Sequence, residues 1–508
     1  MNVIIIAAGK SKRFRDEKIR IPKFLLKINN KFLIENIFEN YDEKCKFKLI
    51  VNKKDYNSHT RDLQSLKKKY ANLSIYEIPN HNLGPVKSLT YVQDIIEDKT
   101  IITYCDFLVE WDFENFKRYC FDKEVVVPFF KGFHPASLGK HTYDYLRNYN
   151  KNKDRINKIK VKESFTKNKM KESGVVGIYY FKDANILKNF LSNIKFMKNE
   201  IYLTHIIQLF LKKKISVHSY QVQKFLCLGT PFDYFQYKNF EVYFNRKKLK
   251  KIMLDQILLP MAGSGSRMKK DLFRTIKPFI TIENKPMYFT ALNDHPNSKS
   301  NYLITNKKQF NKYNFNKLLK NINYKTIYLN GPTESQIHTS LKAINQINHQ
   351  QNVLISSCDY GLSFDPKKLD MKLKKKYDVL IWVFKLKNLV YANKNAFAYC
   401  KTKGQKVIQI SEKKTISNSH DNDHFLVGTF LFRKAEDFFN CIQSSIDKNE
   451  KINNEYYIGN SINSMIKQGK KVLIYEIDSW ASFGTPLELQ IYYYWSDYFH
   501  NLKNAINK

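Results

Sequence analysis

The sequence predicts an α/β protein that contains two copies of one domain, each with a mostly parallel sheet covered by helices. Two observations support this prediction. In each half of the chain, short apolar runs alternate with helical stretches, which is the pattern of parallel strands joined by helices. A Gly-x-x-x-Arg turn follows the first apolar run of each half, and Gly9 and Arg13 recur 254 residues later as Gly263 and Arg267.

The expected elements follow in order along the first half. Its apolar runs are short, as expected for buried strands that alternate with helices. The expected strands cover residues 3–7, 48–51, 73–78, 101–104, 125–129 and 177–181, and the expected helices cover 32–41, 63–70 and 86–96.

The second half repeats this order. Its expected strands cover residues 257–259, 302–305, 325–329, 353–356, 379–384 and 427–432, with a helix near 339–347. The predicted domains are residues 1–245 and 255–508. The lysine-rich stretch 245–256 between them has no Pro or Gly spacer, which favours a short linker and packed domains.

Composition narrows the classes of partner and compartment. A net charge of +39 suits nucleic acid, anionic lipid or phosphorylated small molecules. The lysines are dispersed and no nucleic-acid-binding signature is present, so no nucleic-acid partner is expected. Seven cysteines without a Cys-x-x-Cys pair indicate reduced thiols in a cytoplasmic protein. No apolar run is long enough for a membrane span, and the start of the chain predicts a buried strand rather than a signal peptide.

The two glycine turns are candidate phosphate sites. A strand that runs into a glycine-containing loop presents several backbone N–H groups to one point. Gly263 and Gly265 allow close approach of an anion, whereas the loop at Gly9 has one glycine and two lysines. A single turn of this kind is equally typical of an ordinary tight turn, but its repetition favours phosphate binding.

Two cations follow each turn at the same spacing. Arg13 and Arg267 would neutralise phosphate oxygens, and Lys23 and Lys277 stand ten residues after them. These four residues are the catalytic candidates.

An aspartate follows a strand and a cysteine in both halves. Asp106 and Asp359 are 253 residues apart. Ligands of open α/β sheets bind at the carboxyl ends of strands, where a carboxylate can hold Mg²⁺ against a triphosphate. A helix cap is the alternative role for these side chains.

Two further pairs of turns recur. Gly84-Pro85 and Gly331-Pro332 each precede an expected helix, and would either read a base edge or simply start the helix. Gly229-Thr230-Pro231 and Gly484-Thr485-Pro486 close the two halves, 255 residues apart.

Together these motifs resemble the NTP-transferase family, the nucleotidyltransferases that make nucleotide sugars and related activated alcohols. The second half, with its Leu-Pro-Met-Ala-Gly-Ser-Gly-Ser-Arg turn, is especially similar to bacterial capsule or surface-glycan members. The resemblance covers both halves and implies tandem Rossmann-like domains of the GT-A kind. It also implies Mg²⁺-dependent attack by a sugar phosphate or phospho-alcohol on the α-phosphorus of an NTP, with release of pyrophosphate.

The resemblance also assigns roles to individual residues. The arginines and the loop backbone would hold the β- and γ-phosphates, the two lysines would stabilise the α-phosphate, and the two strand-end aspartates would hold Mg²⁺. The nucleotide-binding residues would be Ala8, Gly9, Gly84, Ala262, Gly263, Gly265 and Gly331, and the substrate-binding residues Glu163, Gly177, Glu412, Lys413 and Gly428.

The sequence departs from the family pattern at two places. The usual second metal aspartate is replaced by Cys227 and Ser482, so Mg²⁺ would rest on one carboxylate with the NTP phosphates, or on Asp112 or Asp478. The usual Glu-Lys pair is matched in the second half only. In the first half Glu163 precedes a serine, although Lys160 and Lys162 are close by.

Two other functions remain open at this point. A GT-A glycosyltransferase would consume a nucleotide sugar, but neither strand-end aspartate belongs to the Asp-x-Asp motif that this class usually needs. One domain could also be a degenerate scaffold or regulator beside a catalytic one. The aromatic stretch 492–499 is expected to close the core, with a subunit contact in a homo-oligomer as the alternative.

Overall fold

Two compact units make up the chain, Met1–Tyr234 and Phe235–Lys508. The division falls inside helix α9 (Pro231–Phe244), upstream of the linker expected at 245–256. No helix among the described residues combines the length and apolar character needed to span a membrane. The computed structural model describes residues 1–506 apart from 139–142, 152, 198, 247–251, 264–267, 269–275, 314–318, 321, 386–393 and 418–422.

The first unit is centred on a sheet in the order β10-β9-β11-β8-β12-β6-β1-β4-β5, with β13 paired to β8. Strand β1 pairs in parallel with both β4 and β6, whereas β12 runs antiparallel between β6 and β8. The strands are β1 (Asn2–Ile6), β4 (Lys46–Asn52), β5 (Leu73–Ile78), β6 (Thr100–Tyr104), β8 (Val125–Phe130), β9 (Tyr145–Asn148), β10 (Ile156–Lys160), β11 (Ser173–Val175), β12 (Ile178–Phe181) and β13 (Val217–Gln221).

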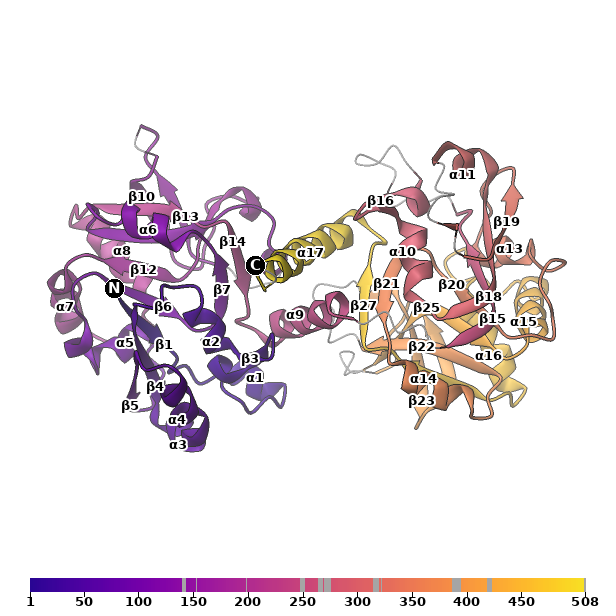
Figure 1. Ribbon diagram of the computed structural model, residues 1–508, viewed down its shortest axis with the longest axis horizontal. Coiled ribbons are helices and arrows are strands. Elements are labelled where there is room, and N and C mark those ends of the chain that lie inside the picture. The colour runs from indigo at the N-terminus through magenta and orange to yellow at the C-terminus, as the bar shows by residue number, and fades with distance from the viewer. Residues whose placement is uncertain are drawn as a thin grey trace. The chain divides into compact units, whose positions relative to one another are not determined.

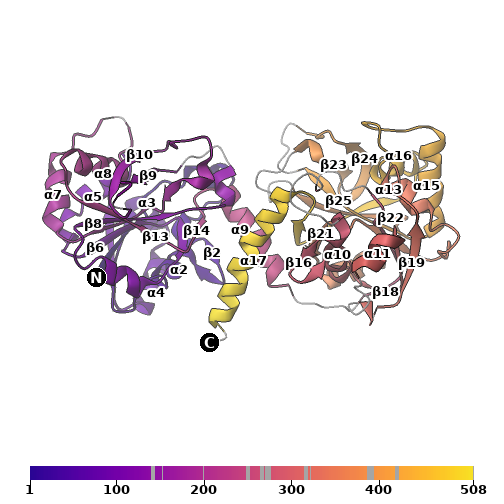
Figure 2. The same cartoon turned by 90° about the horizontal axis from the view of Figure 1, so that it is seen from above.

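Helices cover both faces of this sheet (Figures 1 and 2). On one face, apolar side chains of the central strands pack against α5, α7 and α8. The helix expected at 86–96 is shorter than predicted and ends at Thr90. The helices are α1 (Lys12–Asp16), α2 (Leu33–Phe38), α3 (Lys53–Ser58), α4 (Thr60–Lys69), α5 (Pro85–Thr90), α6 (Phe113–Tyr119), α7 (Ala184–Asn193) and α8 (Leu203–Lys212).

The second unit has a sheet in the order β19-β18-β15-β20-β25-β22-β26-β24-β23. Its first seven strands follow the same order as β5-β4-β1-β6-β12-β8-β13 of the first unit, and β25 is the antiparallel strand in the position of β12. The strands are β15 (Met253–Pro260), β18 (Asn297–Asn306), β19 (Tyr324–Leu329), β20 (Val353–Ser356), β22 (Val379–Lys385), β23 (Ala398–Lys403), β24 (Lys406–Glu412), β25 (His424–Phe432) and β26 (Val472–Glu476).

Two apolar layers fill the second unit, one on each face of its sheet. The mixed α/β class with a mostly parallel central sheet is therefore confirmed. The aromatic side chains near the end of the chain pack inside this unit, as Tyr492 and Trp495 of α17 are almost fully buried. The helices are α10 (Met287–Asp294), α11 (Lys307–Tyr313), α13 (Gln336–Leu341), α14 (Pro366–Leu373), α15 (Ala435–Asp447), α16 (Ile458–Lys467) and α17 (Pro486–Ile506).

A small antiparallel ladder in each unit brings the Gly-Thr-Pro turn to the strand-end aspartate. In the first unit β7 (Phe107–Glu110) pairs with β14 (Lys224–Cys227), and in the second β21 (Tyr360–Ser363) pairs with β27 (Ser479–Ser482). The ladders end in equivalent hydrogen bonds, because the N–H of Leu228 donates to the carbonyl of Asp106 and that of Phe483 to Asp359, both at 2.8 Å.

Gly84 is fixed by its contact with another segment. It precedes α5 with a φ of 84°, and a Cβ on it would lie 2.7 Å from the carbonyl oxygen of Ile201. The N–H of Ile201 donates to Leu83 at 3.0 Å and its carbonyl accepts from Val86 at 3.2 Å. This pairing joins the start of α5 to the segment before α8, and only glycine fits there.

We expect Gly84→Ala to destabilise the protein by about 3 kcal/mol, because backbone strain and a clash with backbone atoms add together. Gly132→Ala is the matched control, since Gly132 has a φ of 103° but no atom within 4 Å of its Cβ position. It should cost only about 1 kcal/mol from strain. Calorimetric melting of both variants checks this, and equal losses would show that the Ile201 segment moves aside.

Candidate functional site

A cavity of about 660 Å³ lies at the carboxyl ends of β1 and β6 in the first unit. Both strands end at the same edge of the sheet, which brings Lys23 and Asp106, 83 residues apart in sequence, to one place. Six of the predicted site residues line it, namely Ala8, Gly9, Arg13, Lys23, Gly84 and Asp106. Glu163 and Gly177 do not line this cavity.

The loop after β1 forms one wall. The amide of Asn52, at the end of β4, donates to the carbonyl of Ala8 at 3.2 Å and holds the loop against the sheet. No atom lies within 4 Å of the position where a Cβ of Gly9 would be. Ser11 then takes a left-handed conformation with a φ of 49° and starts α1, which carries Arg13. The loop is therefore open on the side where an anion would approach.

An ion pair links the loop to the strand-end aspartate. The ammonium of Lys23 lies 3.0 Å from Oδ2 of Asp106, with both side chains partly buried. Burial alone would lower the pKa of Lys23, but Asp106 and Cys105 outweigh it and raise that pKa above its ordinary value. Lys23 is therefore cationic at neutral pH.

The second unit has the same ion pair. The ammonium of Lys277 lies 2.5 Å from Oδ2 of Asp359. Lys277 also begins a short 3-10 helix, as Lys23 does in the first unit. The shared geometry shows that the repeated spacing in the sequence places the same two groups together in each unit.

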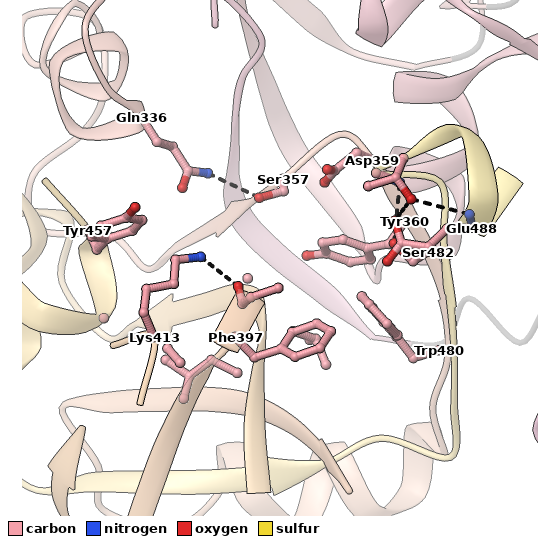
Figure 3. A pocket seen from close by; sticks show the side chains of 18 of the residues that line it. Gln336, Ser357, Asp359, Tyr360, Phe397, Lys413, Tyr457, Trp480, Ser482 and Glu488 are labelled. Atoms are coloured by element: carbon pink, nitrogen blue, oxygen red, sulfur yellow. Dashed lines mark hydrogen bonds between the residues drawn. The ribbon is translucent and has the colours of Figure 1, made fainter. Parts of the chain in front are cut away.

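A cavity of about 470 Å³ in the second unit is lined by Asp359, Glu412, Lys413 and Gly428 (Figure 3). Lys413 and Tyr457 face Trp480 and Glu488 across it. The other predictions for this unit lie elsewhere: Ala262, Gly263, Lys277 and Gly331 do not line this cavity, and Gly265 and Arg267 lie outside the described residues.

Glu412 is a carboxyl group that burial keeps partly protonated at neutral pH. Its pKa is raised to about 7 by burial, and the nearby charge of Lys413 offsets only part of this effect. The start of α16 lies close to it, because a Cβ on Gly459 would be 2.5 Å from its Oε1. Near neutral pH this group is able to donate a hydrogen bond to a ligand oxygen.

Lys162 takes the place in the first unit that the sequence suggested for Glu163. The carboxylate of Glu163 pairs with Lys160 at the surface. Lys162 follows β10 with a φ of 50°, as Lys413 follows β24 with a φ of 58°, and both lysines line their cavities. Hence the position of the Glu-Lys pair in this unit is 161–162, two residues earlier than the expected 163–164.

A tyrosine and a glutamate support each of these lysines. The ammonium of Lys162 lies 4.0 Å from the centre of the Tyr202 ring, and the Tyr202 hydroxyl donates to Glu200. In the second unit the corresponding distance from Lys413 to Tyr457 is 5.2 Å, and the Tyr457 hydroxyl donates to its own acidic partner, Glu455. An Asn-Glu-x-Tyr sequence, repeated 255 residues apart, was the signal that could have identified both.

A second carboxylate faces each strand-end aspartate. In the second unit, a Cβ on Gly484 would lie 3.1 Å from Oε2 of Glu488 and 3.3 Å from Oδ2 of Asp359. The absent side chain leaves a space between two carboxylates. The proximity of Asp359 contributes to a raised pKa of Glu488, for which burial is the main cause.

The first unit has a corresponding carboxylate, Asp233, near Asp106. A Cβ on Gly229 would lie 3.2 Å from Oδ2 of Asp106 and 3.5 Å from Sγ of Cys227, not between two carboxylates. Asp233 takes the place of Glu488, and its Oδ2 accepts from the Thr230 hydroxyl at 2.6 Å and from the Cys227 thiol at 3.5 Å. Burial raises the pKa of Asp233 to about 6, and nearby Asp106 adds to this effect. The sequence signal was a Thr-Pro-x-Asp/Glu turn repeated 255 residues apart.

The paired carboxylates are the candidate ligands for Mg²⁺ in each unit. Asp112 caps α6 and Asp478 pairs with Lys368, and neither lines a described cavity. Within the described residues no cluster of three or more His, Cys, Asp or Glu side chains suits a metal. Two carboxylates in each unit are enough for Mg²⁺, which commonly takes one or two and completes its shell with phosphate and water.

Two predicted glycines, Gly177 and Gly428, have structural roles. Gly177 and Gly428 have φ values of 100° and 88°, and their carbonyls accept from Tyr104 and Ser357 at 3.3 Å. They bring the antiparallel strand against the end of the aspartate strand. Gly331 does not start a helix, because α13 begins after Ser335, whose side chain caps it.

No known protein family matches this chain, and neither does any curated protein. Among solved structures, it is similar to a nucleoside-diphosphate-sugar pyrophosphorylase from Vibrio cholerae RC9, with 19% identity over 46% of this chain and 98% of that one, and a TM-score of 0.39. An inositol-1-phosphate CTP transferase from T. maritima is 12% identical over 49% and 97%, with a TM-score of 0.37. At these values the similarities establish no shared activity.

We expect Glu412→Gln to gain stability relative to the native protein as the pH rises. The folded protein retains the Glu412 proton up to about pH 7, whereas an unfolded chain releases it near pH 4.3, so native stability falls between these values. The variant should gain about 2 kcal/mol at pH 8 compared with pH 5. Urea unfolding at both pH values measures this. The surface variant Glu163→Gln is the control, and an equal pH response in both variants would contradict the assignment.

Proposed function

We propose that this chain transfers a nucleotidyl group from an NTP to a sugar phosphate or phospho-alcohol, with Mg²⁺, and releases pyrophosphate. The observation that carries the proposal is the Lys23–Asp106 pair beside an open glycine loop and Arg13, in one cavity at the carboxyl ends of parallel strands. The Lys277–Asp359 pair repeats it in the second unit. The resemblance of the motifs to surface-glycan members supports a product used as an activated precursor of capsule or other surface glycans.

In this reaction the protein has to position the two reactants and to stabilise the negative charge on their phosphates. A phosphate oxygen of the acceptor attacks the α-phosphorus of the NTP, a new P–O bond forms, and pyrophosphate leaves with the electron pair of the broken bond. Arg13 and the N–H groups around Gly9 would bind the β- and γ-phosphates, and Lys23 would stabilise the charge on the α-phosphate. Lys162, supported by Tyr202, would hold the acceptor phosphate. No covalent intermediate is needed, since held geometry and fixed charges lower the barrier.

The residues that would hold Mg²⁺ are Asp106 with Asp233 in the first unit and Asp359 with Glu488 in the second. When bound, the ion neutralises phosphate charge and orients the triphosphate. Lys23 and Lys277 form ion pairs with Asp106 and Asp359 in this structure, so in each unit the lysine and the metal ion would share one carboxylate.

Asp106→Asn and Asp359→Asn are expected to separate the two units. Each should lower Mg²⁺-dependent pyrophosphate release from its own unit by 100-fold or more, on the order of 3 kcal/mol of lost charge stabilisation. Asp112→Asn and Asp478→Asn are matched controls and should retain activity, because neither lines a cavity. Release is measured with each of the four NTPs and a panel of acceptor phosphates. If only one of the two variants loses activity, the other unit is a scaffold, and if both retain full activity the metal assignment is wrong.

Lys162→Met should raise the KM for the acceptor in the first unit about tenfold and leave the KM for NTP unchanged, since one charge-assisted phosphate contact is lost. The measurement uses the Asp359→Asn background, so that only the first unit turns over. Lys160→Met is the control, because Lys160 pairs with Glu163 at the surface. A change in the KM for NTP instead would place Lys162 on the nucleotide.

A further inference from the structure

Helix α9 forms part of the cavity in the second unit. Gln236, Asn239 and Phe240 line this cavity beside Leu487 and Glu488 of α17. Helices α9 and α17 occupy equivalent positions in the sequence repeat, because α9 begins at the proline of the first Gly-Thr-Pro turn and α17 at the proline of the second. The second cavity therefore has a helical wall made from two equivalent helices, and residues of α9 are candidates for ligand contacts that the second half of the sequence does not supply.

Asn239 fixes this wall. Its amide donates to the carbonyl of Trp480 at 2.8 Å and accepts from the N–H of Trp480 at 3.0 Å. Trp480 packs edge-on against Phe425 and Phe397 at 5.3 and 5.9 Å between ring centres. These bonds bind α9 to β27 and hold the Trp480 side of the cavity in place.

Gln236 of α9 has a side-chain NH₂ group for which the described part of the structure shows no acceptor. The Trp495 indole donates to its Oε1 at 3.1 Å, and an indole N–H is only ever a donor. The amide oxygen is therefore committed to Trp495, and the amide NH₂ is left with two donors. Gln236 is 5% exposed, and no described residue accepts from that nitrogen. Because Gln236 lines the cavity and this nitrogen is not among the fully buried atoms that lack a partner, the NH₂ group is accessible to a ligand oxygen there.

We propose that Gln236 is a specificity-determining residue of the second cavity and donates its amide N–H to an oxygen on the body of the acceptor. This rests on the proposed function, and it narrows the acceptor of this unit to a phosphate ester that carries a further oxygen such as a hydroxyl, the class to which sugar phosphates belong. Lys413 lines the same cavity and takes the phosphate. Gln236 then needs a second oxygen on the ligand as its acceptor, such as a hydroxyl. A sugar phosphate has such a hydroxyl, whereas inorganic phosphate bound at Lys413 has no oxygen that would reach Gln236.

Gln236→Glu tests the contact with little change of shape. The new side chain still accepts from Trp495 but presents an oxygen instead of an NH₂ group to the cavity. The affinities for α-D-glucose 1-phosphate and for inorganic phosphate are measured by calorimetry at pH 8, in a Lys162→Met background that weakens phosphate binding in the first unit. We expect glucose 1-phosphate to bind at least tenfold more weakly in the variant, and inorganic phosphate to change less than twofold.

Gln236→Met removes the donors without adding charge, and it should give the same selective loss. A melting temperature of Gln236→Glu close to that of the background shows that the bond to Trp495 is kept. The inference is overturned if the ratio of the two dissociation constants is the same with and without Gln236→Glu, or if the background has no preference for glucose 1-phosphate. Pyrophosphate release by the native chain reports separately on the proposed function, so the two failures are distinguishable.

Discussion

A lysine ammonium rests on a strand-end carboxylate in both units, and the rest of each site is arranged around that pair. Lys23 reaches Asp106 from the loop that follows the first strand, and Lys277 reaches Asp359 in the same way. The pair joins two strand ends of one sheet edge, so the distance between the phosphate loop and the aspartate is fixed by strand pairing. A triphosphate bound there would meet a cation and a metal-binding carboxylate already in position.

Glycines and short ladders keep this geometry. The Gly-Thr-Pro turn reaches the aspartate through a two-stranded ladder in each unit, and in the second unit its glycine leaves a space between Asp359 and Glu488. Gly84 allows the start of α5 to touch the backbone of Ile201, which places Glu200 and Tyr202 beside Lys162. Backbone contacts of this kind position charged side chains, so that no ion pair is needed to hold those side chains in place.

The two units differ in what surrounds the shared pair. The cavity of the first unit carries several cations, among them Lys10, Lys12 and Arg13. The cavity of the second unit is more aromatic and contains Glu412, which burial keeps partly protonated near neutral pH. The two cavities therefore differ in charge and in lining, and helix α9 lines the second cavity but not the first.

The sequence by itself determined the repeated α/β plan and the strand ends, because these depend on local periodicity and on a constant spacing. The ion pair between each loop lysine and its strand-end aspartate is known only from the structure, since the sequence assigns these two groups separate roles, on the phosphate and on the metal. The expected Glu-Lys position in the first unit, 163–164, was two residues too late, because Lys162 is the lysine that lines the cavity, and a β-bulge or turn is not visible in spacing alone. Only the tertiary structure decided that Asp233 faces Asp106 and that Gln236 lines the second cavity. These residues come from segments distant in sequence, and only packing brings them together.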